Sequence, residues 1–291
     1  MQIRSLLFFL LILTISSCEK YIDIAIPEES NKPVLNLLMN KDSVMIARVT
    51  FSGRLHNFEP MQEAKNATVD LYENGTFKET LTPFVNQGFT YYRANTLPRA
   101  GASYRVTAAI PGFAEVSGTD KIPDTVKIGE TKLVVAQVNG WQTQATVTVQ
   151  LHDDPDVQNY YRIRLYQIYE WKDSYGNIEL HKQLQYFETD EAELPLFNDE
   201  MRSDLYITDA LFNGRSPRFV LRSNVYGDKL KMAVEVTSLT YHSYNYLNSA
   251  YMAWEKNEDP LSEKVIVYNN IVNGLGIVGG VAQRYYELAE Q

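Results

Sequence analysis

The sequence of 291 residues has a single cysteine, Cys18, and four histidines. One cysteine cannot form an intramolecular disulfide, so the folded chain must depend on its hydrophobic core for stability. The same shortage excludes zinc sites built from paired cysteines. The histidines lie far apart in the sequence, and a metal site would require three of them to converge, which we do not expect: His56, His152, His181 and His242.

Basic residues are also scarce, because 27 Lys and Arg face 36 Asp and Glu, which gives a net charge of −9 at pH 7. Removal of residues 1–17 would take away only Arg4 and no acidic residue, leaving a net charge of −10. Nucleic acids and anionic lipid surfaces are bound through basic patches. The excess of acid therefore argues against both as partners.

The short motifs of common enzyme classes are missing as well. The sequence has no Gly-x-Ser-x-Gly elbow, no phosphate loop and no His-Glu-x-x-His pair. A glycine cluster near the end resembles a dinucleotide loop only superficially, because that fingerprint needs a parallel sheet and a following helix. We interpret these glycines as turns or close strand packing: Gly274, Gly276, Gly279 and Gly280.

The first residues have the features of a secretory signal peptide: Arg4, an apolar run over residues 6–15 and then two serines. The run is shorter than the ~20 residues that span a bilayer. The segment ISSC, which ends at Cys18, resembles a bacterial lipobox. We predict that residues 1–17 are a lipoprotein signal peptide and that lipid on Cys18 anchors the protein in a membrane. The alternative is a plainly secreted protein with a chance cysteine.

Residues 18–32 are polar, contain a proline and have no sustained period, so we expect a tether. From residue 33 onward, apolar and polar side chains alternate with period two, which predicts β-strands. Asn74-Gly75 is a strong hairpin signal. The clearest alternations cover residues 45–51, 69–72, 104–110, 145–151, 161–169 and 230–236.

Many short strands predict a mainly β protein with two β-sandwich domains. The content of 20 Tyr, 12 Phe and 3 Trp agrees with this prediction, because aromatic residues are enriched in strands. We place a first sandwich, immunoglobulin-like or prealbumin-like, at residues 33–122. A second sandwich follows at residues 123–291, after a linker around Pro123.

One segment has a helical period instead. Apolar residues recur there at intervals of three, four and three, which predicts an amphipathic helix at about residues 243–256. Ser243 is the expected N-cap, and Pro260 prevents the helix from continuing. The residues expected to pack on the sandwich are Tyr244, Leu247, Tyr251 and Trp254.

Four stretches together resemble a known family: SCEKYIDI, DDPDVQNYYRIRL, YHSYNYLNSAYMAWE and EDPLSEKVIVYNNIVNGLGIVGG. They are similar to the domain-of-unknown-function 4249 family, predicted lipoproteins of Bacteroidota, over nearly the whole mature chain. Leu261 is a mild departure, because the family tends to have Phe there. The resemblance implies an outer-membrane lipoprotein whose genes often lie beside TonB-dependent transporters. It implies no reaction and no catalytic residues.

One loop has residues that calcium accepts as ligands. Calcium prefers six to eight oxygens, often from one irregular loop. The same side chains cap turns in solvated loops, and we favour that role because no bidentate Glu follows at a recognisable spacing. The residues are Asp153, Asp154, Asp156 and Asn159.

The strand after this loop offers a candidate ligand surface. Tyr161, Ile163 and Leu165 share one face and are expected in the core. Their neighbours occupy the opposite, exposed face, where an aromatic and two cations could bind a small ligand, a glycan or a peptide. These neighbours are Arg162, Arg164 and Tyr166.

The leading hypothesis is a non-enzymatic lipoprotein of the bacterial outer membrane, on its periplasmic or outer face, without a cofactor. It would serve as an accessory or ligand-binding partner of a TonB-dependent transporter. The alternatives are a structural or adhesive surface protein and, third, an unrecognised hydrolase. A concave pocket with convergent carboxylates would favour the hydrolase, and a flat, tyrosine-rich exposed patch would favour a binding module. Exposed sheet edges on both domains would favour assembly.

Overall fold

The computed structural model describes residues 31–53, 62–139, 142–189, 201–226, 230–256 and 262–289. In these residues the chain is mainly β, as predicted, with one α-helix and one short 3-10 helix. The signal peptide, Cys18 and most of the tether lie outside the described residues. No helix among the described residues is long and apolar enough to cross a membrane.

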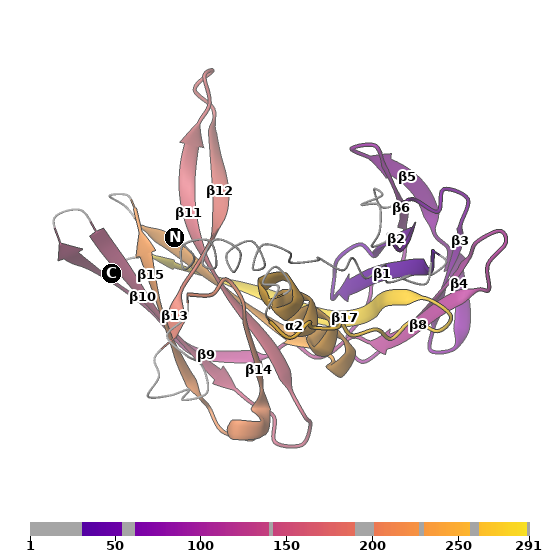
Figure 1. Ribbon diagram of the computed structural model, residues 1–291. Coiled ribbons are helices and arrows are strands. Elements are labelled where there is room, and N and C mark those ends of the chain that lie inside the picture. Colours follow the sequence, from indigo (N-terminus) through magenta and orange to yellow (C-terminus); the bar gives the residue numbers. More distant parts are fainter. Residues whose placement is uncertain are drawn as a thin grey trace, which may run out of the picture.

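The elements follow one another along the chain as labelled in Figure 1. They are β1 (Pro33–Asn40), β2 (Ile46–Phe51), β3 (Thr68–Glu73), β4 (Thr76–Thr80), β5 (Thr82–Asn86), β6 (Phe89–Arg93), β7 (Ser103–Ala109), β8 (Val116–Lys121), β9 (Lys127–Asn139), β10 (Gln142–His152), β11 (Tyr160–Lys172), β12 (Ile178–Gln185), β13 (Glu188–Thr189), β14 (Leu205–Thr208), η1 (Asp209–Leu211), β15 (Arg218–Val225), β16 (Lys231–Leu239), α2 (Tyr241–Lys256) and β17 (Leu275–Ala289).

The strands form three sheets. A nine-stranded sheet has the order β12-β11-β16-β17-β1-β2-β6-β5, with β14 also paired to β11, and it runs through the whole molecule (Figure 1). Two four-stranded sheets, β4-β3-β7-β8 and β13-β15-β10-β9, contribute the opposing layers. The predicted β-sandwich class is therefore confirmed.

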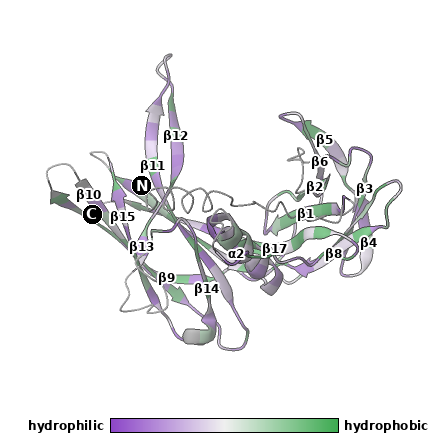
Figure 2. Ribbon diagram, viewed as in Figure 1, coloured by the Kyte–Doolittle hydropathy of each residue, from purple (hydrophilic) through white to green (hydrophobic). Residues whose placement is uncertain are grey.

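The strand β17 belongs to both halves of the long sheet. Its first part pairs in parallel with β1, from Leu275 opposite Val34 to Val281 opposite Asn40. Its second part pairs antiparallel with β16, from Val281 opposite Leu239 to Ala289 opposite Lys231. The hydropathy colouring shows strongly hydrophobic stretches on β1 and β17, as expected for strands in the middle of a covered sheet (Figure 2).

Each half of the long sheet packs on one small sheet around its own core. The core of the first sandwich includes Leu35, Leu71 and Val106, and it also takes in Ile271 and Val278 from the end of the chain. The core of the second sandwich contains Val147 and residues from β11, β15 and β16. Residues near 270–280 thus complete the first core, although they lie about 150 positions beyond its last other residue in the sequence. No local pattern in the sequence predicts this contact.

The predicted helix is present as α2, and it lies across the middle of the long sheet (Figure 1). Its predicted cap is wrong, because the backbone N–H of Ser243 donates to Oγ1 of Thr240 at 3.2 Å, which makes Thr240 the cap. Ser243 itself is buried and donates to the carbonyl of Gly280 at 2.9 Å.

The buried face of the helix was predicted correctly except at its last position. Tyr244, Leu247 and Tyr251 pack against a small cluster on the outer face of the sheet. Trp254, however, is 63% exposed, so its expected burial is wrong. Helical periodicity identifies a face of a helix but not how far the sheet beneath it extends.

Close backbone contacts explain the glycine cluster. A Cβ on Gly280 would overlap the carbonyl oxygen of Lys121 on β8, and one on Gly274 would lie 2.7 Å from the carbonyl oxygen of Pro33. At the same place the N–H of Gly280 donates to the carboxylate of Asp120 at 2.9 Å, and the Thr240 hydroxyl bonds the same carboxylate. Burial raises the pKa of Asp120. This joint fastens β8, β17 and the start of α2 together, and the interpretation of close strand packing is confirmed.

Candidate functional site

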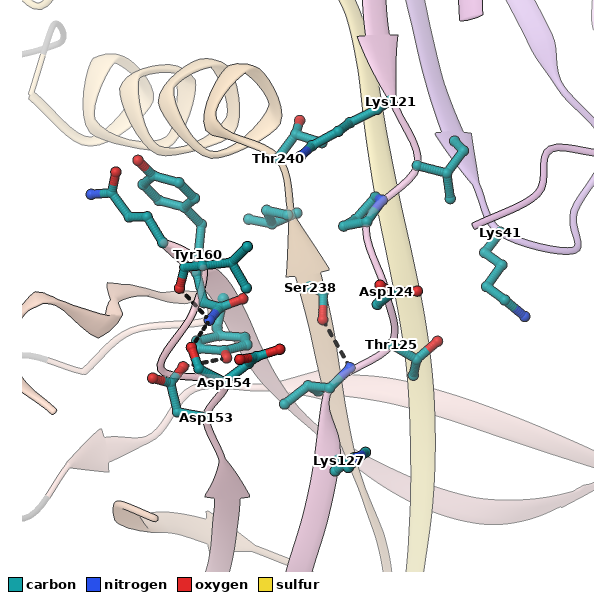
Figure 3. A pocket seen from close by; sticks show the side chains of 18 of the residues that line it. Lys41, Lys121, Asp124, Thr125, Lys127, Asp153, Asp154, Tyr160, Ser238 and Thr240 are labelled. Atoms are coloured by element: carbon teal, nitrogen blue, oxygen red, sulfur yellow. Dashed lines mark hydrogen bonds between the residues drawn. The ribbon is translucent and has the colours of Figure 1, made fainter. Parts of the chain in front are cut away.

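A large hollow of the described structure lies between the two small sheets, on the inner face of the long sheet. It is a cleft with a volume of about 1220 Å³. One wall is the linker from Lys121 to Lys127 between β8 and β9, and the facing wall is the loop over residues 152–159 (Figure 3). The C-terminal end of β16, at Ser238 and Leu239, and Arg284 on β17 also line the cleft.

The loop wall contains the residues considered for calcium, and their oxygens serve hydrogen bonds. The carboxylate of Asp153 accepts from the Tyr161 hydroxyl at 2.6 Å and from the N–H of Gly214 at 2.9 Å. Burial and the adjacent Asp153 raise the pKa of Tyr161, which keeps its hydroxyl protonated as the donor. Oδ1 of Asp154 accepts from the N–H of Asp156 at 3.0 Å, an Asx turn.

Asn159 closes the same loop. Its Nδ2 donates to the carbonyls of Asp154 at 3.0 Å and Val157 at 2.9 Å, and its N–H donates to Oδ2 of Asp209 at 2.7 Å. Within the described ranges, no group of three His, Cys, Asp or Glu residues is placed to hold a metal ion. The side chains of this loop act as turn caps, which is the role we favoured over calcium binding.

The linker wall carries lysines that the sequence analysis did not single out. Lys121, Lys127 and Lys41 line this side, with Asp124 between them (Figure 3). Lys41 pairs with Asp42. Lys121 and Lys127 form no ion pair with any other described residue. No local signal in the sequence joins residues 121–127 to residues 152–159, because only the fold brings these walls together.

The predicted ligand surface lies on the outer face of the long sheet, as expected from its alternation. Its charges, however, are already paired. Nη2 of Arg162 donates to Oε1 of Glu235 at 2.7 Å, and Nε of Arg164 donates to Oδ1 of Asp204 at 2.5 Å. The Tyr166 hydroxyl donates to Oε2 of Glu235 at 3.0 Å. The Arg162 side chain is only 11% exposed, so this group is chiefly an internal network.

The network holds the carboxylate of Glu235 ionised. Burial raises the pKa of Glu235, but the charge of Arg162 and hydrogen bonds from Gln283 and Thr237 outweigh burial and lower it overall. Burial alone would lower the pKa of Arg164. Its hydrogen bond to Asp204 and the negative charge of Asp204 outweigh burial, so the pKa of Arg164 is raised overall. Breaking such a network by removing one partner leaves a buried charge without compensation.

A long hairpin rises from this network. β11 and β12 pair from Leu165 opposite Gln185 to Lys172 opposite Ile178, and Figure 1 shows the ribbon projecting away from both sandwiches. Its tip is ordered by Asp173, whose Oδ1 accepts from the N–H groups of Tyr175 and Asn177, both at 2.8 Å. Exposed apolar side chains cover the hairpin: Tyr169, Trp171, Tyr175, Ile178, Leu180 and Leu184.

Comparison with known proteins identifies the family. The chain belongs to the family described as Domain of unknown function (DUF4249), whose profile matches residues 19–287, so the resemblance seen in the sequence is confirmed. No curated protein matches the chain.

Two solved structures show distant similarity, each at 12% identity. One is a mutant of Salmonella alpha-2-macroglobulin, with a TM-score of 0.22 over 92% of this chain and 15% of that chain. The other is the C-terminal globular domain of an oligosaccharyltransferase from Pyrococcus abyssi, with a TM-score of 0.16 over 90% of this chain and 50% of that chain. This chain therefore spans only a part of either, and TM-scores this low carry no argument about it.

Proposed function

We propose that this protein is a non-enzymatic lipoprotein, anchored through Cys18 in a bacterial outer membrane. It acts as the accessory partner of a TonB-dependent transporter and contacts that partner through the β11–β12 hairpin. The single observation that carries the proposal is this projecting ribbon with its exposed apolar side chains.

A two-stranded ribbon in water is marginally stable by itself. β12 pairs only with β11 in the described sheet, and one face of the ribbon carries Ile178 and Leu180 while the other carries Tyr169 and Trp171. Tyr175 at the tip is 91% exposed. Apolar side chains gathered on an exposed projection are typical of a surface that binds another protein.

The free edge of β12 supports the same contact. An exposed strand edge offers unpaired N–H and C=O groups to a strand of a partner, and side chains on either face then add specificity. Docking onto β12 would cover the hairpin without disturbing the two cores below it.

The predicted anchor makes a weak contact sufficient. A flexible coil with the 14 residues 19–32 of the predicted tether would span roughly 20 Å by root-mean-square scaling. Confinement to one membrane by such a short tether raises the effective concentration of a partner to about the millimolar range. The reach suits a partner in the same membrane and argues against one across the periplasm.

A photo-crosslinking residue in place of Tyr175 tests the contact in intact outer membranes. The matched control is the same residue in place of Val85, which is 70% exposed on the hairpin at the other edge of the sheet. We expect a transporter adduct from position 175 and none from position 85. Cys18→Ala should release the protein from the membrane fraction and abolish the adduct.

Two outcomes would replace this proposal. Adducts from position 175 to a second copy of the chain would support the structural or adhesive alternative. Hydrolysis of a glycan or peptide by the purified protein, together with no adduct under several growth conditions, would support the hydrolase.

A further inference from the structure

The cleft between the sandwiches has walls of opposite charge. Lys121 and Lys127 lie on the linker wall with Asp124 between them, which leaves this wall with a net positive charge, and Asp153 and Asp154 lie on the facing loop (Figure 3). We propose that this cleft binds a short peptide with free termini, whose carboxylate meets the lysines and whose ammonium meets Asp154. The proposal uses a different surface from the hairpin and does not depend on a transporter contact.

The cationic wall is available for a ligand. Lys121 and Lys127 are exposed, and Arg284 contributes a third cation to the lining from β17. Among the described residues, no carboxylate lies within ion-pair distance of these three cations. In a protein with a net charge of −9, such a group stands out as a place for an anion, and a peptide carboxylate fits it.

The acidic wall offers one free oxygen. Both carboxylate oxygens of Asp153 are used by Tyr161 and Gly214. Asp154 uses only Oδ1, in the turn to Asp156, and its Oδ2 bonds no other described residue. An ammonium group placed between the walls would give Asp154 its missing partner.

The linker between the lysines favours a peptide over other ligands with both charges. Residues 122–126 form no strand. Backbone hydrogen bonds with Ala102 and Gly101 hold Ile122 at the start of the segment, and the N–H of Val126 at its end donates to Oγ of Ser238 at 3.0 Å. The N–H groups of Asp124 and Thr125 bond no described residue, although both residues line the cleft. A peptide backbone can pair with such a segment as an added strand. The volume is close to the roughly 300–1000 Å³ of ligand pockets, enough for a few residues.

Calorimetric titration of the full-length protein in detergent tests the proposal, with tetra-alanine as the probe. We expect binding of the free peptide, and at least about tenfold weaker binding when its amine is acetylated or its carboxylate amidated, since each cap removes one charge-assisted contact. Maltotetraose, a neutral glycan of comparable length, should not bind.

Variants assign each end of the peptide. Asp154→Asn keeps the Oδ1 turn cap and should erase only the preference for a free amine. Lys121→Gln with Lys127→Gln should erase only the preference for a free carboxylate. Two control variants should leave both preferences intact. They are Asp156→Asn, at a residue of the same loop that does not line the cleft, and Lys132→Gln on β9.

The proposal is overturned if tetra-alanine does not bind at millimolar concentration, if the capped peptides bind equally well, or if the glycan binds better. Unchanged melting temperatures of the cleft variants would confirm that any lost preference reflects the site and not unfolding.

Discussion

The two edges of the nine-stranded sheet differ in how they are protected. At one edge, β5 and β6 have five residues each, and the guanidinium groups of Arg93 and Arg48 lie over the rings of Phe84 and Phe89 at 4.6 and 4.7 Å. At the other edge, β11 and β12 extend over 13 and 8 residues, and the apolar side chains of the outer part are bare.

Folded proteins usually shield a sheet edge by shortening it or by placing charges over it. The β5 edge is short, although Val85 on it is 70% exposed, whereas the β12 edge is longer and mixes the charged Glu179 and Lys182 with exposed apolar side chains. Because both edges belong to one sheet of one chain, the difference cannot come from the overall composition. The β11–β12 edge carries more exposed apolar side chains than the β5–β6 edge, and our proposal of a partner contact rests on this difference.

The largest expected effect tests whether the buried ion pair between Arg162 and Glu235, below the long hairpin, stabilises the protein. Arg162→Met removes the cation from Glu235, whose side chain is fully buried, and should destabilise the protein by about 3–5 kcal/mol in urea unfolding. The double variant Arg162→Met with Glu235→Leu removes both charges and should regain a large part of that loss. If the losses measured for Arg162→Met and for Glu235→Leu alone simply add in the double variant, Arg162 and Glu235 are not energetically coupled.

The first half contains a buried carboxylate in ion pairs, Glu73, whose contribution to stability can be measured by changing the pH. The Arg99 guanidinium, at 2.5 Å, and Lys78 lower the pKa of Glu73 to about 2. The ionised carboxylate of Glu73 therefore stabilises the folded state at every pH above ~4.5. This contribution is lost as the pH falls from 4.5 towards 2 and the carboxylate is protonated. The pKa shift alone would correspond to ~3 kcal/mol of folding stability. Because Arg99 is 70% exposed and water screens its charge, we expect the contribution of Glu73 to be roughly 2 kcal/mol.

The measurement compares wild type with Glu73→Gln in unfolding experiments between pH 2 and pH 7. Wild type should be more stable at pH 7, and the two should converge near pH 2. A constant difference across this range would mean that the ionised carboxylate is not what stabilises this rim.

A smaller effect is expected where the halves are joined. Gly280→Ala forces the backbone of β17 away from Lys121, at a cost of about 1–3 kcal/mol for an overpacked contact. The control is Gly129→Ala, because the atoms near that position are the ends of the His152 and Gln150 side chains, which can move aside. A normal melting temperature for Gly280→Ala would mean that β8 and β17 are not held in close contact.

The strands and the helix could be predicted because their signals are local. Period-two alternation located most strands, and an interval of three to four residues located α2 to within two residues at its start. The face shared by Arg162 and Arg164 also follows from alternation. The partner of Arg162 does not, because Glu235 lies 73 positions away and nothing local links the two.

The sites depended on such distant contacts even more strongly. The strand at residues 161–169 was expected, but its continuation into a free hairpin depends on which strands fail to cover it. The walls of the cleft come from the segments 121–127 and 152–159, which the three-sheet arrangement brings face to face. The sequence could therefore predict the fold class and the family, but neither candidate site in full.

The smallest expected effect tests the comparison of the two edges directly. Phe84 on β5 is half-buried, lies under Arg93 and stacks on Tyr91 with ring centroids 5.7 Å apart, so Phe84→Ser should cost about 1–2 kcal/mol. Trp171 and Leu180 on the long hairpin are exposed and support no core, so Trp171→Ser and Leu180→Ser should each change the free energy of unfolding by no more than about 0.5 kcal/mol. Thermal and urea unfolding of the three variants give the answer. If Trp171→Ser destabilises the isolated protein as much as Phe84→Ser, the ring has a structural role and the bare edge is no sign of a partner. If Trp171→Ser leaves the free energy of unfolding unchanged but removes the crosslink from position 175, the Trp171 side chain serves a contact with a partner and not the stability of the fold.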